Sequence, residues 1–162
     1  MIEISKLELE RLELIQRDRE KDGLLRDLQK SDSMYKALVK ACTDAVSVTN
    51  LHGDFIEVSQ RTLELHGYNN PEDLLSRSAF DLIDPISHET AEKAMKETLD
   101  RGFAKNVILT LLRKDGSRFI GELNTASIYE CGEPVAFIAI TRNIDRYVKI
   151  QQELNKLNGK DK

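Results

Sequence analysis

The sequence lacks tryptophan and has few residues of several other structure-defining types. Its 162 residues include four tyrosines, five phenylalanines, three prolines and two cysteines. With so few aromatic side chains, a packed core must be built mainly from aliphatic residues. Cys42 and Cys131 lack the spacing of a metal site, and nothing in the sequence requires them to pair. A reducing compartment is the simpler expectation, so the sequence predicts a cytoplasmic protein without a metal site.

Positive charge is not in excess either. Lys and Arg number 24 against 28 Asp and Glu, which gives a formal net charge of −4. A nucleic-acid-binding surface needs surplus cations to displace counterions, so binding to nucleic acid is not expected. No basic segment followed by an apolar run opens the chain, and no apolar stretch approaches the roughly 20 residues that span a bilayer. The length suits one domain with extensions.

The first 30 residues have a helix-forming composition, with no Pro or Thr and a single Gly. Their apolar residues include a heptad seam formed by Ile4, Leu7, Leu14, Leu25 and Leu28. Charged residues interrupt this seam at Arg11, Asp18 and Lys21. The pattern predicts a dimerising coiled coil in which polar positions fix the register, and a solvated helix lying on the domain is the alternative.

The sequence pattern changes after residue 30. Residues 31–33 are of the types that cap helices, so a new short helix is expected over about 34–41. Two short β-rich runs, 45–50 and 55–59, flank a turn at 51–54 and predict a hairpin.

The middle of the chain is predicted to form several short helices. Pro71 and Pro85 break the helical pattern between residues 60 and 101. The longest piece, residues 87–101, has a predicted inner face formed by Ala91, Ala94, Met95, Thr98 and Leu99. This piece is expected to cover one face of a sheet.

Three further strands are expected at residues 106–113, 119–129 and 135–143. An Asp-Gly pair in the first connection is a strong signal for a tight hairpin turn. Because hairpins lie at both ends of the segment, the sequence predicts an α+β fold. It would have a five-stranded antiparallel sheet with helices on one face.

A last helix is expected over about residues 146–158. Its apolar residues are spaced three and four apart and form a second seam of Tyr147, Ile150, Leu154 and Leu157. A terminal helix docked on the domain is one interpretation. With a matching helix at the other end of the chain, a dimer connector is the favoured one.

Four motifs in this order resemble those of bacterial and archaeal PAS (sensory box) domains. They lie at residues 55–68, 71–85, 113–117 and 141–145. The resemblance implies a sheet with strand order 2-1-5-4-3, helices that enclose a small cavity, and flanking helices that dimerise in parallel and pass signals to an output domain. The chain departs from the family at Ser59, where Asn is common. It also departs at Asn143-Ile144-Asp145, where the usual order is Asp-Ile-Thr, which puts the usual relay contacts in doubt.

The resemblance also limits the cofactor. Ala79 stands where the flavin-binding, light-sensing branch has its photoreactive Cys, so adduct chemistry is not possible. His88 comes earlier than the usual haem ligand, and we expect it to be an exposed residue at a helix start. His88 also lies in a Ser-His-Glu run like a phospho-acceptor box, but no dimerisation helix or ATP-binding domain follows it.

No constellation of catalytic residues is evident, so the chain is not expected to be an enzyme. Asp81 and Asp84 are expected to belong to a charged surface, as are Asp44 and Asp54. We find no nucleophile–base pair with a third, orienting group.

A cavity remains as the candidate site. By the resemblance, one parity of the last three strands faces it, namely Leu109, Leu111, Leu123, Thr125, Phe137, Ala139 and Thr141. Such a lining forms either an ordinary packed core or a small-ligand site, because pockets combine apolar walls with a few fixed polar groups.

The sequence thus predicts a dimerising helix (1–30), a PAS sensor domain (31–145) and an output helix (146–162). The expected partners are a second copy, an output domain such as a histidine kinase, cyclase or transcription regulator, and a small-molecule ligand. A scaffold without ligand and a small enzyme are the alternatives. The predicted signal relay is Asn143, Ile144 and Asp145, with Asp145 as N-cap of the last helix, and a plain cap without signalling role as the alternative.

Overall fold

The computed structural model describes residues 5–159. The chain divides into two compact units, residues 1–41 and 42–162. Among the described residues, the first contains a single helix, and the second contains the sheet, the remaining helices and the cavity.

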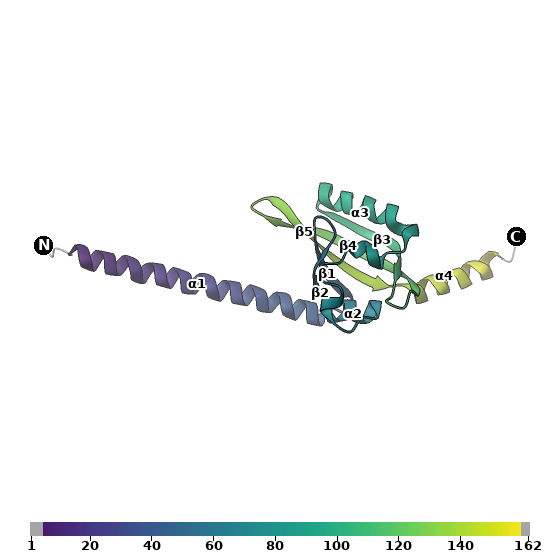
Figure 1. Cartoon of the computed structure of the whole chain (residues 1–162), viewed down its shortest axis with the longest axis horizontal. Helices are drawn as coiled ribbons and strands as arrows, with labels where there is room; N and C mark the ends of the chain where they lie inside the picture. The colour runs from purple at the N-terminus through teal and green to yellow at the C-terminus, as the bar shows by residue number, and fades with distance from the viewer. Residues whose placement is uncertain (1–4, 160–162) are drawn as a thin grey trace. The chain divides into compact units, whose positions relative to one another are not determined.

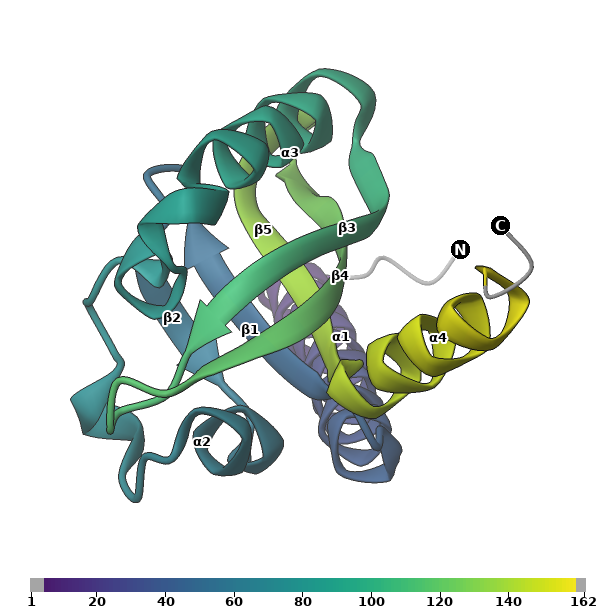
Figure 2. The same cartoon turned by 90° about the vertical axis from the view of Figure 1, so that its right-hand side faces the viewer.

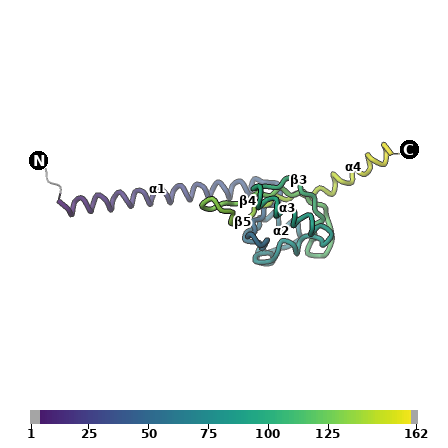
Figure 3. The backbone as a smooth tube through the Cα atoms, turned by 90° about the horizontal axis from the view of Figure 1, so that it is seen from above, coloured from purple at the N-terminus to yellow at the C-terminus, as the bar shows by residue number. Residues whose placement is uncertain are grey.

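The first unit is formed by α1, which runs without interruption over Lys6–Ala41 (Figure 3). It begins with a capping box, in which the Ser5 N–H donates to the Glu8 carboxylate and the Glu8 N–H donates to the Ser5 hydroxyl. The predicted helix break at residues 31–33 is wrong. These cap-type residues lie inside the helix, where Asp32 forms an exposed i,i+4 ion pair with Lys36 at 3.0 Å.

The second unit is built on one sheet of five strands. The strands are β1 (Ala45–Asn50), β2 (Phe55–Val58), β3 (Phe103–Leu112), β4 (Arg118–Glu130) and β5 (Glu133–Asn143). They pair antiparallel in the order β2-β1-β5-β4-β3. The predicted fold and strand order are therefore confirmed.

The helices between β2 and β3 lie on one side of this sheet (Figures 1 and 2). α2 (Gln60–His66) is capped by Ser59, whose hydroxyl accepts from the Thr62 N–H, and it ends at Gly67 with φ +78°. Three short 3₁₀ helices follow over Pro71–Asp73, Ala79–Leu82 and Pro85–Ser87. The two prolines begin 3₁₀ helices because their fixed φ and missing N–H suit a first helical position.

The long helix α3 (His88–Arg101) packs against β3 and β4. On the inner face of α3, Ala91 and Thr98 are buried, and Ala94 and Met95 line the cavity described below. Leu99 was predicted on the same face but is exposed. It follows the buried Thr98 directly, and one residue turns an α-helix by about 100°. α4 (Asp145–Asn158) follows β5 directly.

The core of the second unit consists of two buried clusters. One contains Phe55, Leu63, Tyr68, Leu74 and Leu82. The other contains Ile83, Ala91, Leu109, Leu111 and Phe119. Leu63, Leu74 and Phe119 are almost fully enclosed, so these clusters fix the helices on the sheet.

Candidate functional site

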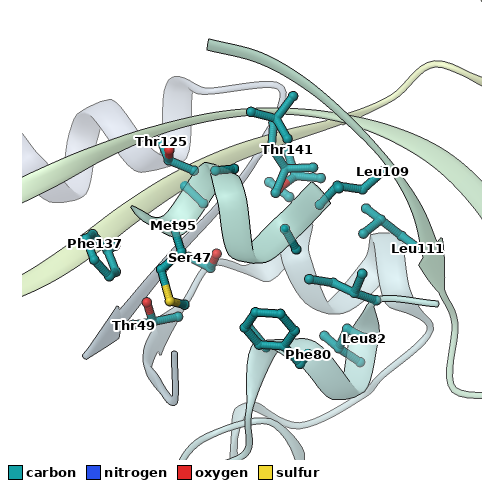
Figure 4. Close-up of a pocket in the computed structure, with 18 of the residues that line it drawn as sticks. Ser47, Thr49, Phe80, Leu82, Met95, Leu109, Leu111, Thr125, Phe137 and Thr141 are labelled. Carbon is teal, nitrogen blue, oxygen red and sulfur yellow. The ribbon is translucent and has the colours of Figure 1, made fainter. Parts of the chain in front are cut away.

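A cavity of about 120 Å³ lies between the inner face of the sheet and the helices (Figure 4). Its walls come from all five strands, from α2 and α3, and from the segment between them. All seven cavity residues proposed from the sequence line it: Leu109, Leu111, Leu123, Thr125, Phe137, Ala139 and Thr141.

Sequence reasoning missed the contribution of β1. Ala45, Ser47 and Thr49 alternate with the buried Val46 and Val48 and line the cavity. The alternation of small and branched residues in this strand was the available signal, since successive side chains of a strand point to opposite faces. The α2 residues Thr62 and His66 were missed as well.

The hydroxyl groups of the lining fall into two sets. In the first set, the Thr62 hydroxyl donates to the Val46 carbonyl at 2.7 Å. The Thr98 hydroxyl donates to the Ala94 carbonyl at 2.6 Å and lies 2.6 Å from the Thr125 hydroxyl. These three groups are satisfied by the protein itself.

The second set comprises Ser47, Thr49 and Thr141, whose hydroxyls have no hydrogen bond to any described residue. Thr49 is only 9% exposed and Thr141 only 8%. Within residues 5–159, no fully enclosed side-chain polar atom lacks a partner. The free hydroxyls of these buried residues therefore remain open to a water-sized molecule, as groups that line a cavity must be.

His66 supplies the one titratable group of the lining. Its Nδ1 lies 2.7 Å from the Leu112 carbonyl, which identifies Nδ1 as the protonated nitrogen that donates. Burial lowers the pKa of His66, the hydrogen bond to Leu112 opposes this shift, and the charge of Arg113 adds to it. The imidazole also meets Phe119 edge-on, with ring centroids 5.3 Å apart. The cavity wall is therefore uncharged near neutral pH.

Two residues beside the cavity were predicted wrongly. His88 is half-buried rather than exposed, because its Nε2 lies 2.8 Å from the Ile83 carbonyl and 3.1 Å from that of Phe80. Asp84 is only 4% exposed, not part of a charged surface, because its carboxylate pairs with Arg118 at 2.6 Å and accepts from the Ile86 N–H. Both residues hold the start of α3 in place.

The junction between β5 and α4 contains the predicted relay residues. The Ile144 N–H donates to the Ile120 carbonyl at 2.9 Å, and the Ile120 N–H donates to Asp145 Oδ1 at 2.7 Å. The Asn143 side chain accepts from the Asp145 N–H at 2.9 Å. Asp145 is thus not the N-cap as predicted. Ile144 occupies that position, and the Asp145 carboxylate binds the neighbouring strand instead of the helix N-terminus.

The seam residues of both terminal helices are exposed. In α1 these are Leu7, Leu14, Leu25 and Leu28, and in α4 they are Tyr147, Ile150, Leu154 and Leu157. Ile4, the first predicted seam residue, lies outside the described residues. Because α1 continues to Ala41, the same three-four spacing extends the seam through the charged Asp32 to Tyr35 and Val39.

Comparison with known families agrees with this architecture. A sequence model of the PAS domain matches residues 43–146. The chain belongs to the PAS domain family. The match begins just after α1 and ends just inside α4, so it covers the sheet, the cavity and the junction of this PAS domain.

Solved PAS structures resemble the chain over most of their own length. A PAS domain from Colwellia psychrerythraea is 25% identical with a TM-score of 0.63, over 70% of this chain and 98% of that one. The PAS domain of an HTR-like protein from Haloarcula marismortui is 26% identical, with a TM-score of 0.57 and coverages of 79% and 99%. A light-oxygen-voltage domain studied with a flavin analogue is 27% identical, with a TM-score of 0.61 and coverages of 79% and 96%.

No curated protein matches the chain. Between residues 5 and 159, no helix has the length and apolar character needed to cross a membrane. The same part of the chain contains no group of three or more His, Cys, Asp or Glu side chains that could hold a metal ion.

Proposed function

We propose that this PAS domain is a sensor and dimerisation module of signal transduction, in which a small molecule in the cavity sets the state of an output domain through α4. PAS domains are in general sensory and signalling modules. The observation that carries the proposal is a continuous path from the cavity to α4. β4 and β5 supply five of the cavity residues, and both strands run to the junction with α4.

The path is short. On β5, Thr141 lines the cavity two residues before Asn143, whose side chain accepts from the first N–H of α4. On β4, Leu123 lines the cavity three residues after Ile120, which holds Ile144 and Asp145. A ligand that shifts the two strands relative to each other therefore acts on the two hydrogen bonds that join Ile120 of β4 to Ile144 and Asp145 at the start of α4.

A cavity-filling variant tests this path without requiring the ligand. Ala139→Leu places extra atoms in the cavity, whereas Ala126→Leu adds the same atoms to the outer face of the neighbouring strand. We expect Ala139→Leu to cost less than the about 1–3 kcal/mol typical of overpacking a filled core. We also expect it to change hydrogen exchange in the first turn of α4, and Ala126→Leu to leave that exchange unchanged.

Two outcomes would count against the sensor. If Ala139→Leu is tolerated but exchange in α4 is the same as in the wild type, the cavity is not coupled to the helix. If Ala139→Leu destabilises the fold as overpacking does, the space is filled in solution and a scaffold without ligand is the better interpretation.

The proposal does not involve flavin-adduct or haem chemistry. Ala79 lines the cavity and has no thiol to form an adduct. An engineered cavity of about 150 Å³ holds benzene, so a cavity of about 120 Å³ is too small for a three-ring flavin or a haem without rearrangement.

Dimerisation is proposed to occur through the exposed seams, in a parallel arrangement. In a parallel coiled coil each seam residue packs among four residues of the facing helix, including neighbours of its own counterpart. Arg11 then faces the partner's Glu10. Asp18 in the same way faces the partner's Arg17. When the two helices are in register, Arg11 and Asp18, two of the three charges that interrupt the seam of α1, therefore each have an opposite charge beside their own counterpart on the facing helix.

A further inference from the structure

The cavity itself limits the chemistry of what it can hold. This inference rests on the proposed function, since it names the class of ligand for the same site. The lining contains no Asp, Glu, Lys or Arg side chain, and its one titratable residue, His66, is held neutral by burial. A carboxylate or ammonium group placed here would lose its hydration and gain no opposite charge, which is strongly unfavourable. The ligand must therefore be uncharged.

Volume limits the ligand further. With about 120 Å³ available, the cavity is somewhat smaller than the roughly 150 Å³ engineered cavity that takes up benzene. This leaves space for about six non-hydrogen atoms or fewer. Most of the wall is aliphatic, with Leu109, Leu111 and Leu123 on β3 and β4. The body of the ligand must be small and apolar.

The lining hydroxyls without a partner are confined to two adjacent strands, β1 and β5. Ser47 and Thr49 are two residues apart on β1 and so point to the same face. Thr141 pairs with Ala45 on the adjacent strand, which places it diagonally from Ser47. These are the three residues whose hydroxyls have no partner among the described residues, and Thr49 and Thr141 are more than nine-tenths buried.

We infer that the ligand is a small neutral oxygen-bearing molecule, such as an alcohol or ketone, whose oxygen is hydrogen-bonded by the free hydroxyls of Ser47 and Thr49 on β1. Its apolar body lies against Phe137 and Ala139, which pair with Thr49 and Ser47 on the adjacent strand. A hydroxyl both donates and accepts, so it can satisfy the oxygen of either group. An apolar molecule of the same size leaves these buried hydroxyls without partners, which weakens its binding. Thr49 is the principal anchor because it is the more buried of the two β1 residues.

The test uses the full chain and three probes with the same number of non-hydrogen atoms: cyclopentanone, methylcyclopentane and butyrate. Binding is followed by the chemical shifts of backbone amides in the strands that line the cavity. We expect cyclopentanone to bind at millimolar concentration, methylcyclopentane to bind more weakly and butyrate not to bind. Thr49→Val and Ser47→Ala should each weaken the binding of cyclopentanone about 2- to 10-fold, which is the effect of one hydrogen bond. Neither variant should change the affinity for methylcyclopentane.

Two control variants show that the effect comes from the hydroxyl. Thr49→Ser keeps the hydroxyl and should keep the preference for cyclopentanone. Thr110→Val makes the same isosteric change on β3 outside the cavity and should have no effect.

The possible failures are distinguishable. If cyclopentanone and methylcyclopentane bind equally and neither hydroxyl variant matters, the ligand class is wrong while the cavity remains a binding site. Binding of butyrate as tight as that of cyclopentanone also overturns the class. If no probe shifts the cavity amides, the cavity is not a binding site, and the ligand sensing in the proposed function fails with it.

Discussion

The junction of β5 with α4 depends on one carboxylate, and its removal should have a measurable effect. Pairing between β4 and β5 ends where Gly121 faces Asn143. At the next residue of β4, the Ile120 N–H has Asp145 Oδ1 as its acceptor, at 2.7 Å. The carboxylate therefore continues the hydrogen-bond ladder beyond the last strand pair. Asp145→Ala leaves this half-buried N–H without a partner.

The expected cost follows from that loss. Leaving a buried donor unsatisfied costs about 1–3 kcal/mol. An effect of that size changes the local opening equilibrium about 5- to 150-fold. Asp145→Asn retains an oxygen at the same position and loses only the charge, so it should cost about 1 kcal/mol or less.

Native-state hydrogen exchange of the full chain measures this directly at the Ile120 amide. Protection of Ile120 should fall strongly in Asp145→Ala and only slightly in Asp145→Asn, while amides in the middle of β1 keep their protection. The reasoning is refuted if Ile120 remains as protected in Asp145→Ala as in the wild type. Equal losses in the two variants would show that charge, rather than the hydrogen bond, holds the junction.

Three further predictions concern assembly, acid stability and the core. In light scattering of the full chain, Leu14→Lys on the seam of α1 should shift a dimer toward monomer, whereas Leu12→Lys off the seam should not. An equal effect of both would place the interface elsewhere. Because the folded-state pKa of His66 is lowered by burial, the unfolded chain binds more protons below about pH 6.5. Unfolding free energy should therefore fall as the pH drops from about 6.5 through the folded pKa of His66, and this component should be absent in His66→Gln. A wild-type pH dependence that persists unchanged in that variant contradicts the assignment. In denaturant unfolding, Leu63→Ala in the enclosed core should cost about 2–5 kcal/mol. Leu123→Ala, at a half-buried position beside existing space, should cost less, and equal costs would mean that the cavity is filled.

Much of the fold could be predicted because its signals are local. Asp-Gly and Gly turns fix the hairpins of β3, β4 and β5, and strand alternation then fixes which residues face inward. The continuity of α1 could not be predicted in this way. Residues 31–33 are good caps by type, but exposed Ser and Asp side chains cost less than about 1 kcal/mol each inside a helix, so they are tolerated there when their neighbours continue it.

The site was predictable only where a pattern within one strand revealed it. Asp84 and His88 were assigned to the surface because the groups that bury them are distant in sequence or are backbone carbonyls. Asp145 was assigned as a cap for the same reason, since its acceptor role depends on a backbone N–H of another strand. Hydrogen bonds between main chain and distant side chains leave no periodic trace in a sequence.

The central claim is that occupancy of the cavity alters α4 through the junction. The most direct test is hydrogen exchange of α4 in the full chain with and without cyclopentanone, for the wild type and for Asp145→Ala. The account predicts that the probe changes exchange in the first turns of α4 in the wild type. In Asp145→Ala the probe should still bind but leave α4 exchange unchanged. Probe binding that shifts the cavity amides of the wild type without any change in α4 would contradict the claim.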